Sequence, residues 1–312
     1  MDFCEWRALL ARAAVAAALV VPASAAAKEC GGAVACACGD AVRGVAMLEG
    51  DLLGCATGLR VKDHAVLDCD GHAIVGDGDG EGVVVEGERS VVRDCTVSGF
   101  RTGIRLRAGG GHLIAYNDVV GNARYGIELA VATTGNLLLG NAVLDSGDEG
   151  VHVGTAADHN VLVDNEIAGS GKENLYLLDV RGCLVAANRL AGGGSAAMYV
   201  KHSAGNVFAG NEVDDRPIQL RGESDRNVFE GNVLRKAGFL FQAYEDEERG
   251  WKGPRENLVR RGAVRDAKTC FRFDGATDNV VSGVLTDGCA PVAQKKAGGI
   301  APTGNVVDVV RE

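Results

Sequence analysis

Proline and aromatic residues are scarce in this chain. Of its 312 residues only 5 are proline, and phenylalanine, tryptophan and tyrosine together make up 5%. So few rings provide little material for a conventional globular core, in which aromatic side chains contribute much of the buried area. Intrinsic disorder is nevertheless excluded, because 46% of the residues are hydrophobic. The 45 glycines favour a regular fold in which glycine recurs at fixed positions.

Long hydrophobic runs are missing after residue 25. Before that point, Arg7 and Arg12 precede an apolar run that ends in the small residues Ala-Ser-Ala at 23–25. This pattern predicts a secretory signal peptide over residues 1–25, with a buried N-terminal helix as the alternative. No later stretch approaches the roughly 20 apolar residues of a membrane span. We therefore expect an exported protein, secreted or periplasmic, without a transmembrane segment.

An excess of positive charge is absent as well. The chain has 32 basic and 42 acidic residues, which gives a net charge of −10. In the predicted leader, Asp2 and Glu5 balance Arg7 and Arg12, so the exported chain keeps the same charge of −10. Nucleic acid is therefore not an expected partner, because its binding depends on lysine and arginine that neutralise phosphates.

Cysteine usage agrees with export. The chain has 10 cysteines, of which Cys4 lies in the predicted leader, so nine exported cysteines leave one unpaired. We expect residues 26–58 to form a disulfide-rich cap. A metal site at its Cys-Ala-Cys sequence is the alternative, but no histidine lies near it to complete a zinc ligand set. The four cysteines of this segment are Cys30, Cys36, Cys38 and Cys55.

Asparagine recurs with a regular period. Phrases of the form N-φ-φ-x-x-N, where φ is apolar, place their second asparagine at 117, 141, 165, 188, 211 and 232, at intervals of 24, 24, 23, 23 and 21 residues. Stacked on successive coils about 4.8 Å apart, such side chains can hydrogen-bond to those above and below. We therefore predict an asparagine ladder. The phrases read HLIAYN (112–117), GNLLLGN (135–141), HNVLVDN (159–165), CLVAAN (183–188), GNVFAGN (205–211) and RNVFEGN (226–232).

An apolar-x-apolar triplet shares this period, and its alternation predicts a strand. Each repeat of about 20 to 24 residues must hold two strands and two turns, so it has no room for a helix, which excludes leucine-rich and ankyrin repeats. A parallel solenoid of strands over residues 59–312 is predicted. The triplets start at Leu59, Val83, Ile104, Ile127, Val151, Leu175, Met198, Ile218, Phe239, Phe271 and Val292.

These units, G-φ-x-φ followed by N-φ-φ-x-x-N, resemble the right-handed parallel β-helix proteins of the pectin-lyase-like superfamily over roughly residues 59–310. The resemblance implies an all-β fold: a right-handed parallel β-helix of about eleven coils behind the disulfide-rich cap. One coil, from Phe239 to Phe271, runs 32 residues. Its excess, residues 243–256, is expected to bulge as a loop that carries Trp251.

The repeat register also places the remaining cysteines. Cys69 and Cys95 occupy the column of the second asparagine, where they either pair or simply stack. Cys183 replaces the first asparagine of its coil and is the expected buried free thiol. Cys270 and Cys289 are expected to bond across the last turn.

Outward positions of the triplet strands form a candidate binding face. The middle residue of each triplet and the residue after it point outward. Tyrosine beside arginine and lysine suits an acidic glycan, because rings pack on sugars and cations pair with carboxylates. The alternative is an ordinary solvated surface, since these residue types are common on exposed strands. The candidate substrate-binding residues are Arg105, Arg107, Glu128, His152, Tyr176, Tyr199, Gln219 and, on the expected loop, Trp251.

Two consecutive coils, MYVKHSAGNVFAGN (198–211) and IQLRGESDRNVFEGN (218–232), look most like the alginate-lyase and chondroitinase-B-like polysaccharide lyases. The resemblance implies that Lys201 and Arg221 form a catalytic pair, in which the lysine removes the proton α to a uronate carboxyl and the arginine assists as the acid. That family carries metal-binding glutamates just before the lysine, whereas residues 192–197 here read GGGSAA. The predicted function is binding, with cleavage or epimerisation, of an acidic polysaccharide.

No cofactor is expected, with calcium as the alternative. In GDGDGEGVVVEGE (76–88), Asp77, Asp79, Glu81 and Glu88 fall at positions 1, 3, 5 and 12 of an EF-hand-like loop. Flanking strands and the periodic Gly82 favour a turn instead.

A non-catalytic structural or binding β-helix of the cell envelope is the second interpretation of function. Such a protein would be akin to the β-helix accessory proteins that load copper into periplasmic reductases. Copper calls for clustered histidine, methionine or cysteine. Here the six histidines and three methionines are scattered along the sequence.

Overall fold

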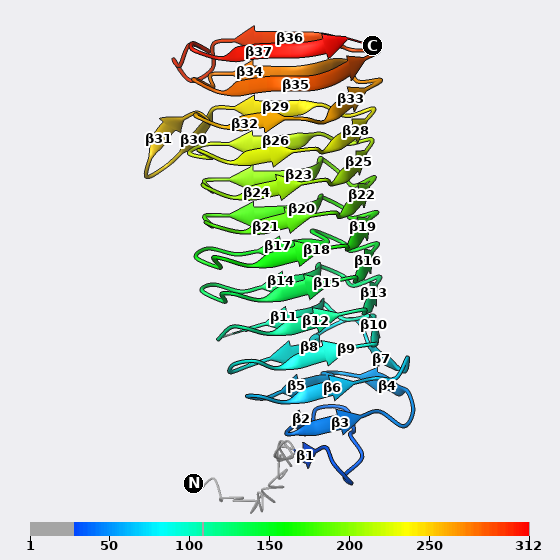
Figure 1. The fold of residues 1–312 in the computed structure, drawn as a ribbon. Coiled ribbons are helices and arrows are strands. Elements are labelled where there is room, and N and C mark those ends of the chain that lie inside the picture. Colours follow the sequence, from blue (N-terminus) through cyan, green and yellow to red (C-terminus); the bar gives the residue numbers. More distant parts are fainter. Residues whose placement is uncertain (1–27, 108, 312) are drawn as a thin grey trace, which may run out of the picture.

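The computed structural model describes residues 28–107 and 109–311. The predicted signal peptide lies outside the described residues. Throughout these two ranges the chain forms short strands and no helix, and the strands wind into a right-handed parallel solenoid (Figure 1). None of the described residues belongs to a helix long and apolar enough to cross a membrane.

Sheet 1 takes one strand from each coil and contains all eleven predicted triplets. Its strands, in spatial order, are β1 (Glu29–Cys30), β2 (Ala41–Val42), β5 (Leu59–Val61), β8 (Glu81–Val85), β11 (Thr102–Leu106), β14 (Tyr125–Leu129), β17 (Val151–Val153), β20 (Glu173–Leu178), β23 (Ala196–Lys201), β26 (Ile218–Arg221), β29 (Phe239–Gln242), β34 (Thr269–Asp274) and β36 (Ala290–Lys295).

Sheet 2 takes two strands from most coils, which form two parallel rows joined at a corner. The first row is β3 (Val45–Met47), β6 (Val66–Asp68), β9 (Val91–Arg93), β12 (Leu113–Ala115), β15 (Leu137–Leu139), β18 (Val161–Val163), β21 (Leu184–Ala186), β24 (Val207–Ala209), β27 (Val228–Glu230), β32 (Leu258–Arg260), β35 (Val280–Asp287) and β37 (Val306–Arg311). The second row is β4 (Leu52–Cys55), β7 (Ala73–Gly76), β10 (Thr96–Ser98), β13 (Asp118–Val120), β16 (Ala142–Leu144), β19 (Glu166–Ala168), β22 (Arg189–Ala191), β25 (Glu212–Asp214), β28 (Val233–Arg235) and β33 (Ala263–Arg265), and it ends against β35.

The period seen in the sequence is the length of one coil. On sheet 1, Glu128 pairs with His152, His152 with Tyr176, and Tyr176 with Tyr199, so triplet middles stack in one column. The flanking triplet residues point inward and are fully buried, as Ile127 and Leu129 are. Alternation therefore fixes which side chains fill the core and which line the outer face.

Two asparagine ladders run inside the turns. The predicted ladder extends from Asn117 to Asn232, where each side-chain amide donates to the next side-chain oxygen at 2.9–3.0 Å. A second ladder, built from the first asparagine of each phrase, continues from Asn206 through Asn227, Asn257 and Asn279 to Asn305. These bonds satisfy amides that water cannot reach.

The four cap cysteines are bonded as expected, and of the two alternatives for Cys69 and Cys95 the structure has the bond. Cys30 bonds to Cys36 and Cys38 to Cys55 in the N-terminal cap, Cys69 pairs with Cys95, and Cys270 pairs with Cys289. Cys183 is a buried free thiol, as expected. Eight bonded cysteines among the described residues fit an oxidising compartment.

The glycine-rich stretch at 76–88 continues the solenoid. Gly82 lies in β8, where a Cβ atom would meet Cγ1 of Val97 at 2.4 Å and the carbonyl oxygen of Gly103 at 2.6 Å, so only glycine fits. In residues 28–107 and 109–311, no group of three or more His, Cys, Asp or Glu side chains is placed to hold a metal ion.

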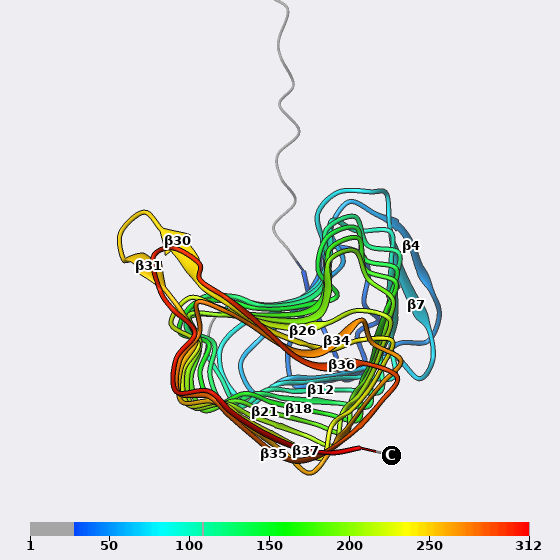
Figure 2. The same cartoon turned by 90° about the horizontal axis from the view of Figure 1, so that it is seen from above.

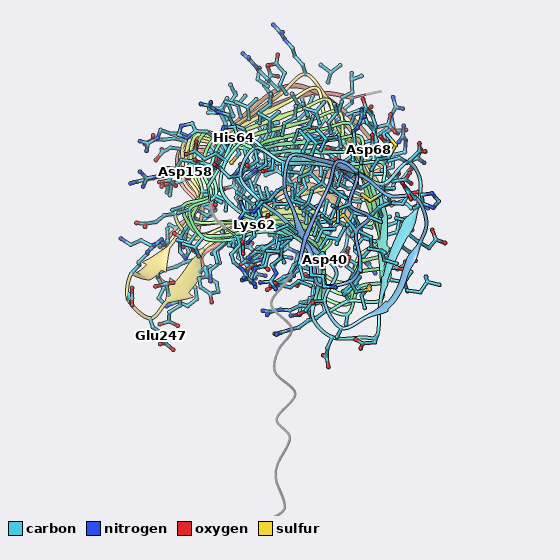
Figure 3. All side chains as sticks on the ribbon, turned by 90° about the horizontal axis from the view of Figure 1, so that it is seen from below. Asp40, Lys62, His64, Asp68, Asp158 and Glu247 are labelled. Carbon is cyan, nitrogen blue, oxygen red and sulfur yellow. A yellow bond between two sulfur atoms is a disulfide. The ribbon has the colours of Figure 1, made fainter. Side chains whose placement is uncertain are left out.

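The extra residues of the long coil bulge out as predicted, but they form a two-stranded hairpin where a loop was expected. Strands β30 (Tyr244–Asp246) and β31 (Gly250–Lys252) pair antiparallel. Seen along the solenoid axis, the hairpin projects from one corner of the coil (Figure 2). Glu247 lies at its outer tip (Figure 3).

Candidate functional site

An aromatic row crosses the outer face of sheet 1. Tyr125 stacks on His152 with ring centroids 4.8 Å apart, and His152, Tyr176 and Tyr199 follow at 5.2 Å intervals. Tyr125 was not among the predicted residues, because strict alternation from Ile127 would turn it inward. Gly126 breaks the alternation: a Cβ atom there would meet Cγ1 of the core residue Val143 at 2.3 Å. Because each ring partly covers its neighbour, these rings offer less flat surface to a sugar than isolated rings would.

Burial shifts the pKa values of the side chains in this row. Burial, with a contribution from Arg124, lowers the pKa of His152 from 6.5 to about 4. Burial also raises the pKa of Tyr176 and of Tyr199. The row is therefore uncharged at neutral pH, and its polar atoms act as hydrogen-bonding groups.

Lys201 and Arg221 lie side by side at one end of the row. They are direct partners on β23 and β26. The Arg221 guanidinium carbon lies 5.2 Å from the Tyr199 ring centroid, and the Lys201 ammonium lies 4.2 Å from that of Tyr244. Within the described part of the chain, neither cation makes an ion pair with a carboxylate. Both side chains are half-buried, and the Arg221 Nε atom is buried without a hydrogen bond.

The next residue, His202, connects the pair to the hairpin. Its Nδ1 accepts a hydrogen bond from the backbone N–H of Glu223 at 3.2 Å, so the proton of the neutral ring sits on Nε2, 3.4 Å from Asp246 Oδ2. Burial, followed by the nearby Arg249, lowers the pKa of His202. The sequence pattern did not single out His202, because its buried place at a turn follows from the hairpin.

Ion pairs hold the hairpin against the turns of earlier coils. Arg249 pairs with Asp179 at 2.9 Å and with Glu223 at 3.9 Å, and Lys252 pairs with Glu223 at 3.6 Å. Together with the Lys201–Tyr244 contact, they place the hairpin as a wall beside Lys201.

Trp251 does not join this site. In the hairpin it pairs with Glu245, whereas Tyr244 pairs with Lys252, so Trp251 and Tyr244 point to opposite faces. Trp251 lies against Gly298 and lines a separate hollow that Ile300 also borders. Gln219 does lie beside the pair, where its amide donates to the Ser195 carbonyl at 3.2 Å and its own oxygen is buried without a partner.

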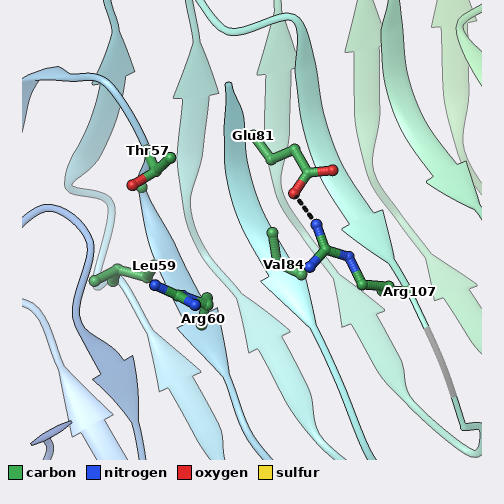
Figure 4. A pocket seen from close by; sticks show the side chains of 7 residues that line it. Thr57, Leu59, Arg60, Glu81, Val84 and Arg107 are labelled. Carbon is green, nitrogen blue, oxygen red and sulfur yellow. Dashed lines mark hydrogen bonds and ion pairs between the residues drawn. The ribbon is translucent and has the colours of Figure 1, made fainter. Parts of the chain in front are cut away.

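Two arginines of the earlier coils, Arg105 and Arg107, are neutralised by glutamates. Arg105 contacts Glu81 at 2.5 Å and Glu128 at 3.1 Å. Arg107 contacts Glu81 at 2.6 Å, and Figure 4 shows this second contact. Burial raises the pKa of Glu128, while Arg105 opposes that shift. Two adjoining surface hollows, of about 200 and 290 Å³, share Thr57 and Glu81. This end of the face is a salt-bridge network, unlike the unpaired cations at Lys201 and Arg221.

Two family profiles match parts of the chain. One is described as "Periplasmic copper-binding protein (NosD)" and matches residues 56–181, and the other as "Right handed beta helix region" and matches residues 131–247. No curated protein sequence matches the chain.

Several solved structures share the fold. The mannuronan C-5 epimerase AlgE6 A-module of Azotobacter vinelandii is 15% identical, with 87% of this chain and 82% of that chain covered and a TM-score of 0.51. The periplasmic alginate epimerase AlgG is 12% identical (86% and 78% covered, TM-score 0.54). The catalytic unit of a GH87 α-1,3-glucanase from Streptomyces thermodiastaticus strain HF3-3 is 13% identical (88% and 64% covered, TM-score 0.54). Likeness at this level concerns architecture, and it agrees with the strand register: the chain is a right-handed parallel β-helix.

Proposed function

We propose that this protein binds an acidic polysaccharide along the outer face of sheet 1, with Lys201 and Arg221 gripping a uronate carboxylate. The observation that carries the proposal is the pairing of two half-buried cations that have no carboxylate partner among the described residues. Like charges on adjacent strands repel, so the folded chain retains an electrostatic cost that a bound anion removes.

The surroundings of the pair support a sugar ligand. Tyr199 and Gln219 lie beside it, and Tyr244 walls it on the hairpin side. Solved β-helix structures with this architecture include alginate epimerases and a glucanase, which is consistent with a glycan partner.

The same pair suggests how a bound uronate would react. Lys201, in its neutral form, would take the proton α to the carboxylate, and Arg221 would stabilise the negative charge that develops on the carboxylate oxygens. The electron pair of the broken C–H bond would form a carbon–carbon double bond as the glycosidic oxygen leaves and takes a proton from water. Alternatively, the carbanion would take a proton from water on the opposite face of the ring. The first outcome is elimination and the second is epimerisation.

Binding and turnover are tested separately. Isothermal titration with alginate, pectate and chondroitin oligosaccharides should show binding that Lys201→Ala weakens at least tenfold, whereas Arg189→Ala on sheet 2 leaves it unchanged. A neutral glucan should not bind. Ultraviolet absorbance from unsaturated uronate ends would report elimination. Equal affinity of the parent and Lys201→Ala for these oligosaccharides would refute the proposed site.

The NosD match over residues 56–181 supports a second candidate, a non-catalytic accessory β-helix of the periplasm. The same match and the disulfides are consistent with a periplasmic or secreted location. Copper titration monitored by tryptophan fluorescence tests this candidate: saturable binding with no uronate binding would favour it over the glycan proposal.

A further inference from the structure

The outer face of the first row of sheet 2 carries an apolar strip. On each of β12, β15, β18, β21 and β24, two outward side chains flank a buried middle residue. All ten outward side chains are aliphatic, although outward positions of a water-covered sheet are normally polar. Leu184 and Val207 are 36% and 38% exposed, seven others are partly exposed and Ala115 is buried. The apolar strip consists of Leu113, Ala115, Leu137, Leu139, Val161, Val163, Leu184, Ala186, Val207 and Ala209.

Opposite charges mark the two ends of the apolar strip. The coil before it contributes Arg93 from β9, and the coil after it contributes Glu230 from β27. Strand pairing puts both in the same outward column as Val163. Arg93 and Glu230 each lie three coils from β18, and their side chains are 50% and 32% exposed. In this column the aliphatic run is therefore symmetric in length about β18 and opposite in charge at its ends, while the other outward column stays aliphatic at Val91 and Val228.

We propose that the apolar strip is the interface of a homodimer, in which two solenoids pack side by side with opposite axis directions. The twofold axis runs along β18, so that Val163 faces its own copy. Rotation about the strand direction keeps each residue's place along the strand and exchanges β9 with the partner's β27. Arg93 of each copy then faces Glu230 of the other copy, and the pair forms twice.

Charge selects this arrangement over its alternative. Two solenoids with the same axis direction would also cover the strip, but each coil would then lie level with its own copy, so Arg93 would be level with Arg93 and Glu230 with Glu230. Arg93 also contacts Asp68, and Glu230 contacts Arg260 and Arg261, which hold the two side chains at the surface. Two contacts oppose the proposed arrangement. Arg89, at the turn before β9, lies level with Arg226 of the other copy, and the exposed Asp164, which follows Val163, lies near its own copy.

The size of the face predicts a weak dimer. Six strand spacings of about 4.8 Å make the face roughly 29 Å long. With the adjoining turns it is roughly 20 Å wide, so each copy covers about 600 Å², the lower end for specific interfaces. The strip is not a glycan site, because aliphatic side chains carry no hydrogen-bonding groups for a sugar. It is also separate from the sheet 1 site, so the dimer proposal and the glycan proposal can each fail without the other.

Sedimentation velocity on the full chain from about 1 to 100 µM tests the dimer. We expect a reversible monomer–dimer equilibrium. Val163→Glu places two carboxylates against each other on the axis and should leave only monomer, while circular dichroism and thermal unfolding stay close to the parent. Ser282→Glu lies in the same column on β35, outside the apolar strip, and should dimerise like the parent. Monomer throughout for the parent, or a dimer for Val163→Glu, would overturn the proposal.

Charge reversal and cross-linking test the direction of packing. Arg93→Glu should weaken the dimer at least tenfold, and adding Glu230→Arg should restore it. With a short bis-maleimide, Val163→Cys should cross-link to itself, and Arg93→Cys should cross-link only when mixed with Glu230→Cys. Self-cross-linking of Arg93→Cys alone would show the same-direction arrangement and refute this one. If Arg93→Glu or Glu230→Arg impairs folding, the cross-links alone still determine the direction of packing.

Discussion

The side-chain oxygen of Asn165 accepts two hydrogen bonds from Asn141, one from its side-chain amide at 2.9 Å and one from its backbone N–H at 3.0 Å. Asn165 in turn donates to the side-chain oxygen of Asn188 at 2.9 Å. One buried side chain thereby joins three coils. At the start of the ladder, the Asn117 oxygen accepts one bond, from the backbone N–H of Cys95.

This difference predicts unequal losses along the ladder. Asn165→Ala strands two donors of Asn141, whereas Asn117→Ala strands one donor of Cys95. A buried unpaired group costs about 1–3 kcal/mol, so Asn165→Ala should lower the free energy of unfolding by about 1–2 kcal/mol more than Asn117→Ala. Asn188→Ala should behave like Asn165→Ala. Urea unfolding measures the loss of unfolding free energy in each variant. Equal and small losses at all three positions would contradict a stabilising role for the ladder.

The sequence predicts this fold well because the repeat length is also the distance between spatial neighbours. Once the period is known, residues 21 to 26 positions apart become adjacent. The Cys69–Cys95 bond, the asparagine ladder and the Lys201–Arg221 pairing all follow from that spacing. The second ladder could also have been predicted, since the first asparagine of each phrase recurs with the same period.

The candidate site was predicted less completely, for two physical reasons. Residues 243–256 break the period, so nothing in the spacing places Tyr244 over Lys201 or Asp246 near His202. Long side chains also reach across columns. Glu81 lies two positions before the triplet that starts at Val83, yet its carboxylate binds both Arg105 and Arg107 on the next coil. Strand register gives backbone neighbours, but it does not determine these ion pairs.

Arg221→Lys tests whether the guanidinium geometry matters for carboxylate binding. A lysine keeps the charge but loses the planar pair of donors and the contact with Tyr199. We expect the affinity for a uronate oligosaccharide to fall about tenfold, with thermal unfolding unchanged because an outward cation adds little stability. Isothermal titration measures the change. Affinity equal to that of the parent would mean that Arg221 contributes charge alone.

Alkylation without reductant tests the cysteine assignments. Cys30, Cys36, Cys38 and Cys55 should resist labelling because they are bonded. Cys183 should resist it for another reason: burial shields the thiol and raises its pKa to about 11. Within residues 28–311, mass spectrometry should therefore find one labelled thiol, Cys183, and only after denaturation. Four labelled thiols in the segment 28–58 would refute the cap disulfides.

His152 should make the protein less stable in acid. Its pKa is about 4 in the folded chain, against an ordinary value of 6.5. Between these two values the unfolded chain binds a proton that the folded chain does not, so the contribution of the neutral ring, present above pH 6.5, is lost as the pH falls towards 4. The loss is at most about 3 kcal/mol. His152→Gln cannot titrate, so urea unfolding at pH 7 and pH 4.5 should show a smaller drop for the variant than for the parent. An NMR titration of the folded parent should place the His152 midpoint well below 6; a midpoint near 6.5, or equal drops for both proteins, would show that the aromatic row does not shield the ring.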